Sequence, residues 1–129
     1  AHLARAALEA MAYSTLDVAA AMEGDAGVSL PELRVDGGAT ANDWLMQFQA
    51  DVLRIPVRRP ALVETTALGA AGLAGLSLGV WESPEDFLAA RPEETLFRPQ
   101  AAEVQREEWL SGWHRALAAA RTWARGGDE

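Results

Sequence analysis

The sequence predicts an α/β fold in which helices pack on a few short strands. Three observations lead to this class: helical and extended segments alternate along the chain, 50% of the residues are hydrophobic, and 129 residues suit a single domain. Only two short extended segments are recognisable, which is too few for an independent sheet. We therefore expect them to be edge strands of a sheet whose other strands lie outside this sequence.

A first helix is expected over residues 1–22, ahead of the turn-rich segment 23–27. Its apolar residues recur at the spacing of one helix face, namely Leu3, Ala7, Leu8, Met11, Ala12, Leu16, Ala19 and Met22. No capping residue precedes this helix. The uncapped start suggests that the chain was cut from something longer.

Two strands and a second helix are expected next. Residues 32–36 form the first predicted strand, and the helix is expected over 41–53. Thr40 is its expected N-cap, with Asp43 at the third helical position as a variant of the capping box. The second predicted strand spans 57–60 and is closed by a proline.

A third helix is expected over 66–79, capped by Thr65 or Thr66. The uncharged run 67–81 is shorter than the roughly 20 apolar residues of a membrane span, so it predicts a helix buried in a water-soluble protein. Each glycine in a helix costs about 1 kcal/mol of helix propensity. Three glycines on one face therefore indicate the close approach of another backbone element: Gly69, Gly72 and Gly75.

The C-terminal part contains a segment broken by three prolines, over 83–100, and then a last helix expected over 101–124. One face of this helix is apolar and rich in tryptophan. We expect that face to join the core rather than to form a stacking platform for a ligand; its residues are Trp109, Leu110, Trp113, Leu117 and Ala120.

Composition excludes several functions. The net charge is −8 and the pI is near 4.7, which argues against nucleic acid or an anionic membrane as the main partner. The chain has no cysteine, so disulfides and thiol nucleophiles are excluded, and a cytoplasmic setting is consistent with this. All 11 basic residues are arginine, so a Walker-type phosphate loop, which needs a lysine, is excluded as well.

A pair of glycines, Gly37 and Gly38, separates the first predicted strand from the second helix. One explanation is a turn that needs a positive φ angle at a glycine. The other is a ligand that approaches the bare backbone at a helix N-terminus, where free N–H groups favour anions. Asn42 is the only asparagine in the chain and lies on the first helical turn. It is therefore a candidate for hydrogen bonds to a ribose or a purine edge.

The remaining polar candidates are assigned structural roles. His2 and His114 have no clustered partners, so no metal site is predicted. Asp36 is interpreted as a carboxylate that stabilises the turn. Arg58 and Arg59 are interpreted as a solvated strand edge.

Two stretches, "LRVDGGATANDWLMQFQADVLRIPV" and "VETTALGAAGLAGLSLGVW", resemble the C-terminal part of glycerol kinases, in the FGGY group of carbohydrate kinases. The motifs "DGGA", "LMQFQAD" and "ETTALGAA" are specific in this order and spacing, and the resemblance covers essentially the whole chain. "HLARAALE", residues 2–9, resembles the closing half of the second FGGY signature. The chain would then begin inside that signature.

The resemblance implies an actin-like, ribonuclease H-like ATPase fold, with ATP against the C-terminal domain and the polyol against the N-terminal one. Residues 1–129 would form the C-terminal part of the nucleotide-binding domain, incomplete at its N-terminal side. Gly38 would lie against the adenosine, and Asn42 would contact it. Asp43 departs from the asparagine that is common in the family, which puts a second amide contact in doubt.

By the same resemblance, the chain would belong to a kinase that phosphorylates glycerol to glycerol 3-phosphate with ATP and Mg²⁺. The catalytic base, the metal ligands and the polyol contacts would lie upstream, so no catalytic or metal-binding residue is assigned here. The chain alone is expected to be inactive, and the full-length protein a cytoplasmic homo-oligomer. Three alternatives remain open: another FGGY sugar or polyol kinase, a nucleotide-binding module without chemistry, and an interaction module of the same fold.

Overall fold

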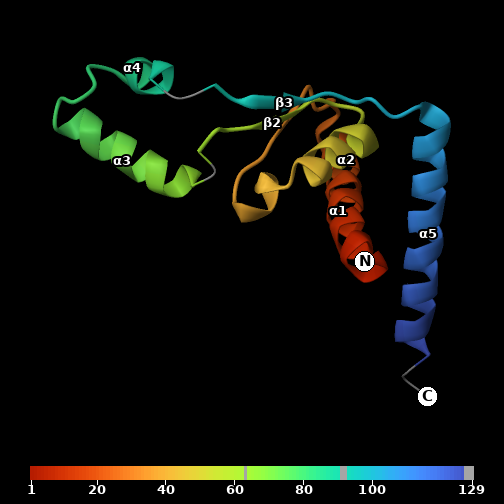
Figure 1. The fold of residues 1–129 in the computed structure, drawn as a ribbon. Helices are drawn as coiled ribbons and strands as arrows, with labels where there is room; N and C mark the ends of the chain where they lie inside the picture. Colours follow the sequence, from red (N-terminus) through yellow and green to blue (C-terminus); the bar gives the residue numbers. More distant parts are fainter. Residues whose placement is uncertain (63, 91–92, 127–129) are drawn as a thin grey trace.

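The computed structural model describes residues 1–62, 64–90 and 93–126 and has the mixed α/β class that the sequence predicts. Figure 1 shows α1, α2 and α5 gathered at one end, α3 and α4 at the other, and strands running between them. The elements in chain order are α1 (His2–Ala26), β1 (Leu33–Arg34), the 3₁₀ turn η1 (Gly38–Ala41), α2 (Asp43–Leu53), β2 (Val57–Arg59), α3 (Thr65–Ser77), α4 (Pro84–Ala89), β3 (Thr95–Phe97) and α5 (Glu103–Arg125).

The strands form one small sheet in the order β1-β2-β3. β1 runs parallel to β2, with Leu33 opposite Val57, and β2 runs antiparallel to β3, with Val57 opposite Phe97. Both predicted strands are confirmed, although β1 is shorter than expected. The expectation that both are edge strands is wrong for β2, which is paired on both sides. The sequence missed β3, because three residues inside a proline-interrupted segment carry too little alternation to be recognised.

The first helix continues beyond its expected end. α1 includes most of the turn-rich segment 23–27 and ends only at Gly27, whose φ of 67° is left-handed and whose N–H donates to the carbonyl of Glu23 at 2.9 Å. A left-handed glycine is the common way to terminate an α-helix. The polar residues of this segment therefore extend the helix, and the glycine at its end stops it.

The core lies between α1, α2, β2 and one face of α5. Phe48 is at its centre, with its ring edge-on to Tyr13 at 5.5 Å and tilted against Trp109 at 5.0 Å. Trp113 stacks on Tyr13 at 5.2 Å. This confirms the core role of the first part of the apolar face on α5. The helix then extends beyond the core, and Trp123 near its end is 87% exposed.

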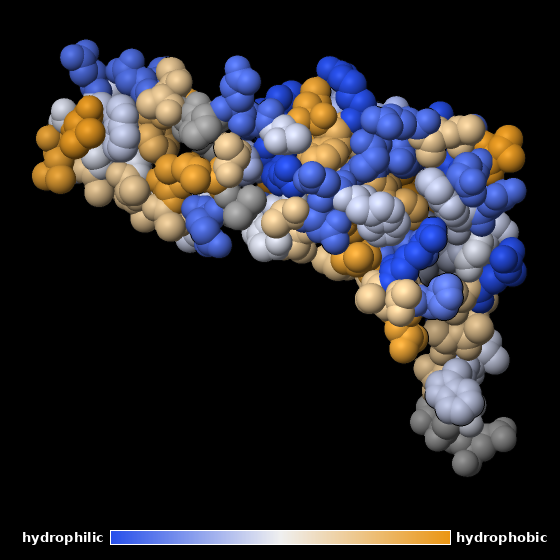
Figure 2. Space-filling view, in the orientation of Figure 1, coloured by the Kyte–Doolittle hydropathy of each residue, from blue (hydrophilic) through white to orange (hydrophobic). Residues whose placement is uncertain are grey.

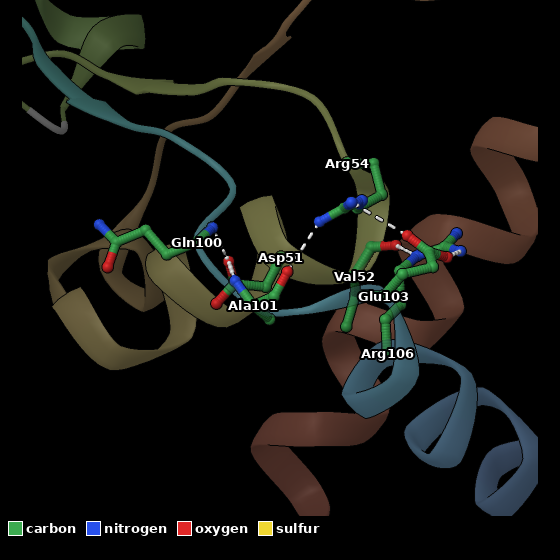
Figure 3. A network of polar contacts seen from close by, with 7 residues as sticks. All are labelled: Asp51, Val52, Arg54, Gln100, Ala101, Glu103 and Arg106. Carbon is green, nitrogen blue, oxygen red and sulfur yellow. Dashed lines mark hydrogen bonds and ion pairs between the residues drawn. The ribbon is translucent and has the colours of Figure 1, made fainter.

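Polar contacts fix the start of α5 against α2 (Figure 3). The carboxylate of Asp51, 8% exposed, accepts backbone N–H groups from Gln100 at 2.6 Å and Ala101 at 3.0 Å. From the other side, Arg106 of α5 donates to the carbonyl of Val52 at 2.8 Å. The Arg106 bond satisfies a carbonyl that the C-terminal end of α2 leaves unpaired, and the Asp51 bonds hold the two residues that precede the N-cap of α5.

The helix α3 is not buried, in contrast to the sequence-based expectation. It packs mainly on α4, and the two lie apart from the core (Figure 1), with apolar residues visible at that end of the molecule (Figure 2). The glycines Gly72 and Gly75 are covered by the rings of Phe87 and Trp81, so aromatic side chains make the predicted close approach instead of a second backbone. A Cβ on Gly72 would lie only 2.6 Å from the Phe87 ring.

The pKa of Tyr13 tests whether its side chain is packed in the core as described. Burial raises the pKa of its phenol to about 12, with a further contribution from Glu9 that Arg5 partly offsets. The folded pKa lies above the ordinary value of 10.0. Ionisation of Tyr13 therefore leaves the free energy of unfolding unchanged below pH 10 and lowers it as the pH rises from 10 towards 12. Tyr13 is the only tyrosine in the chain, so tyrosinate absorbance should titrate near 12 in the folded protein and near 10 in urea. A folded-state midpoint near the ordinary value would contradict this packing.

Candidate functional site

The double-glycine turn lies at the carboxyl end of β1, which is parallel to β2. Ligands of open α/β sheets bind outside the carboxyl ends of parallel strands. Gly37 has a φ of 83° and is the residue that the turn requires to be glycine. Its carbonyl accepts both the backbone N–H of Thr40 at 3.1 Å and the Thr40 hydroxyl at 2.7 Å.

Gly38 differs from Gly37 in a way that the sequence could not reveal. It opens the 3₁₀ turn η1 without a positive φ, and a Cβ built on it would meet nothing within 4 Å. The fold of the described residues therefore has no need of glycine at this position. A ligand, or another part of a larger protein, is what a bare backbone at Gly38 can accommodate.

Asn42, and not Thr40, caps α2. The Asn42 side-chain oxygen accepts the N–H of Leu45 at 3.1 Å, while the Thr40 hydroxyl bonds back to Gly37. The predicted Thr40 cap is wrong because η1 occupies the residues in between and delays the start of the α-helix to Asp43. Among the hydrogen bonds of the described residues, the amide N–H₂ of Asn42 donates to none. Half-buried Asn42 therefore keeps two donors available beside Gly38.

Arg59 was missed as a site residue by the sequence. Its Nη1 donates to the carbonyl of Thr40 and to Oδ1 of Asp43, both at 2.7 Å, and its guanidinium lies 5.1 Å from the centre of the Phe97 ring. With a side chain only 16% exposed, Arg59 is not the solvated edge that we expected. Alternation along β2 was the available signal, because it places Arg58 and Arg59 on opposite faces.

Arg58 lies in a different cluster. It donates to Glu32 at 3.0 and 3.1 Å and is 3.4 Å from Glu94. The hydrogen bond from Arg58 and a second one from Arg34 hold the pKa of Glu32 below its usual range. Arg58 is therefore not a free strand edge either, and its side-chain partners are Glu32 and Glu94 rather than residues of the glycine turn.

Asp36 ties the end of β1 to α3 by accepting a hydrogen bond from the hydroxyl of Thr65. Asp36 therefore has a structural contact, but the contact is with α3 and not with the turn that we expected it to stabilise. The expected threonine cap of α3 is wrong, because Glu64 occupies the N-cap position without a side-chain bond. Asp36, Thr65 and Arg58 line a polar cleft of about 260 Å³ beside the turn.

The described residues contain neither a metal cluster nor a membrane helix. No group of three or more His, Asp or Glu side chains in residues 1–62, 64–90 and 93–126 could hold a metal ion. No helix within these ranges is both long and apolar enough to cross a membrane. The polar groups around Gly38 and Asn42 suit an organic ligand held by backbone and amide contacts.

Comparison with known proteins identifies the family. Residues 1–78, which include the whole glycine turn, match the family model described as the C-terminal domain of the FGGY family of carbohydrate kinases. A glycerol kinase of Burkholderia ambifaria is 55% identical over 124 residues, and one of Deinococcus radiodurans is 54% identical over 123. These matches cover 96% and 95% of this chain. The chain spans about a quarter of the length of these curated relatives (25%).

Solved structures give the same result. The crystal structure of Plasmodium falciparum glycerol kinase with ADP matches with a TM-score of 0.73 and 32% identity, over 92% of this chain and 24% of that one. A xylulose kinase from Rhodospirillum rubrum matches with a TM-score of 0.66 and 28% identity, over 95% and 25%. Both likenesses confirm the expected fold, part of an actin-like, ribonuclease H-like domain. Together with the family model, they establish that the chain belongs to the FGGY family of carbohydrate kinases.

Proposed function

We propose that this chain is the C-terminal part of a glycerol kinase and supplies the adenosine-binding side of its cleft. In this proposal, residues 1–129 belong to the nucleotide-binding domain and are incomplete at their N-terminal side. The reaction is transfer of the γ-phosphoryl group of ATP to glycerol. Identity of 54–55% to glycerol kinases, against 28% to a xylulose kinase, favours glycerol over a sugar as the acceptor.

One observation carries the nucleotide assignment. Gly38 has no side chain, although the fold leaves room for one at this position. We assign this space to the adenosine part of ATP or ADP. Asn42 is placed beside it as the residue that contacts the nucleotide, with its amide N–H₂ as donor, while its oxygen caps α2. The structure of the Plasmodium falciparum glycerol kinase is one with ADP, which supports a nucleotide as the ligand.

The described residues offer no carboxylate cluster for Mg²⁺, so we assign the metal ligands, the catalytic base and the glycerol contacts to the rest of the enzyme. Phosphoryl transfer depends mainly on positioning and on neutralising charge, and this chain would contribute the positioning of adenosine. We further propose that the complete protein, called the parent protein below, is a cytoplasmic homo-oligomer.

The activity test compares the chain with the parent protein. The 129-residue chain, mixed with glycerol and Mg-ATP, is expected to form no ADP above a buffer control, because it lacks the base and the phosphate contacts. The parent protein is expected to form ADP with glycerol and much less with xylulose. Turnover by the chain alone, or a parent protein that does not phosphorylate glycerol, would contradict the proposal.

A further inference from the structure

We infer that Arg59 is a positioning residue of the nucleotide turn, which holds Thr40 and Asp43 on either side of Asn42 and neutralises Asp43. This inference rests on the proposed function. Arg59 comes from β2, outside the turn, and is separated from Asn42 by 17 positions in the sequence. The residue therefore connects the sheet to the site.

Arg59 holds the turn by hydrogen bonds to residues on both sides of Asn42. One nitrogen, Nη1, donates at 2.7 Å to a backbone carbonyl two residues before Asn42 and at 2.7 Å to the carboxylate one residue after it. The guanidinium also lies over the ring of Phe97 on β3, 5.1 Å from the ring centre. An arginine held in this way, with its side chain 16% exposed, has little freedom to move.

Charge gives Arg59 its second role. Asp43 is the acidic residue in the first turn of α2, and its carboxylate, 76% exposed, lies next to the residue proposed to contact the nucleotide. An uncompensated carboxylate at this place would add a negative charge to the binding site of an anionic nucleotide. Arg59 cancels that charge through a direct ion pair, so the turn keeps the anion preference of a helix N-terminus.

The chain offers a matched control on the same strand. Arg58 is the neighbouring arginine, is also ion-paired, and contacts Glu32 and Glu94 but not the turn. Replacing either arginine with methionine removes one charge and keeps most of the side-chain length. Only the change at Arg59 should alter the nucleotide site.

The experiment uses the parent protein and measures KM for ATP, KM for glycerol, Kd for ADP and thermal melting. Arg59→Met is expected to raise KM for ATP and Kd for ADP by about tenfold, as for loss of a charged hydrogen bond, with KM for glycerol changed by less than about twofold. Arg59→Lys should give an intermediate effect, because an ammonium keeps the charge but not the planar fork. Arg58→Met should leave the ATP and ADP constants unchanged.

A double variant tests whether Arg59 acts by neutralising the charge of Asp43. Adding Asp43→Asn to Arg59→Met removes the unpaired carboxylate and is expected to recover about threefold of the lost ATP affinity, a non-additive effect between contacting residues. If Arg59→Met does not fold, Arg59→Lys carries the same test. Nucleotide constants that stay at parental values, or that rise together with KM for glycerol, would overturn the inference.

The outcomes also separate this inference from the proposed function. If Gly38→Val weakens ATP binding and folded Arg59→Met does not, the Arg59 inference fails and the nucleotide site remains supported. If the parent protein binds ADP but does not phosphorylate glycerol, the proposed reaction fails, and Kd for ADP still decides the role of Arg59. A parent protein that binds neither ATP nor ADP would overturn both.

Discussion

Replacing Gly38 with valine in the parent protein is expected to raise KM for ATP by about tenfold or more, or ~1.4 kcal/mol of lost binding. KM for glycerol should change by less than about twofold, because the acceptor is assigned to the other domain. The physical reason is that the valine side chain would occupy space assigned to the ligand. A Cβ built on Gly38 meets no atom within 4 Å beyond its chain neighbours, so we expect the methyl groups of valine to extend into the space assigned to adenosine.

Two further variants make this result specific. Gly112→Val introduces the same side chain on α5, where a Cβ would make only an ordinary contact with Arg115, and should leave the ATP constant unchanged. Asn42→Ser keeps an oxygen that can cap α2 but removes the amide donors. It should weaken ATP binding by about 1–2 kcal/mol if one good hydrogen bond is lost. All variants must melt like the parent, and a folded Gly38→Val protein with parental ATP affinity would refute the site.

Replacing Asp51 with alanine is expected to lower the free energy of unfolding of the chain by about 3 kcal/mol, since each hydrogen bond to a charged group contributes roughly 1.5–3 kcal/mol. The buried Asp51 oxygen accepts two backbone N–H groups and the side-chain amide of Gln47 at 3.2 Å. Alanine leaves these donors without that acceptor and frees the start of α5 (Figure 3). Urea unfolding followed by circular dichroism measures the change.

The control for Asp51 lies at the same junction. Glu103 forms ion pairs with Arg54 at 3.0 Å and Arg106 at 3.1 Å, but its side chain is 49% exposed. Exposed pairs contribute little, so Glu103→Ala should cost less than about 1 kcal/mol. Asp51→Asn keeps an acceptor oxygen and should fall between the two. Equal losses for Asp51→Ala and Glu103→Ala would show that the Asp51 carboxylate has no special role in holding α5.

The four longer helices and the glycine turn could be predicted from the sequence because their signals are local, whereas the short helix α4 inside the proline-interrupted segment was missed. Apolar spacing located α1, α2 and α5 to within a few residues, and Gly37 and Gly38 marked the strand-to-helix turn. The choice between Thr40 and Asn42 as the cap could not be made this way. Both are good capping residues, and only the 3₁₀ turn between them decides which one begins the α-helix.

The sequence by itself determined the α/β class, the four longer helices and the family resemblance, since these depend on residue order and short spacings. Tertiary structure alone decided which glycine is free for a ligand and what Arg59 does. Both glycines have empty space where a Cβ would lie, and Gly38 is distinguished from Gly37 by its backbone angle, because only Gly37 has a positive φ. Arg59 reaches Asp43 only because folding brings β2 beside the turn. Contacts between residues far apart in the chain depend on packing, which no local pattern encodes.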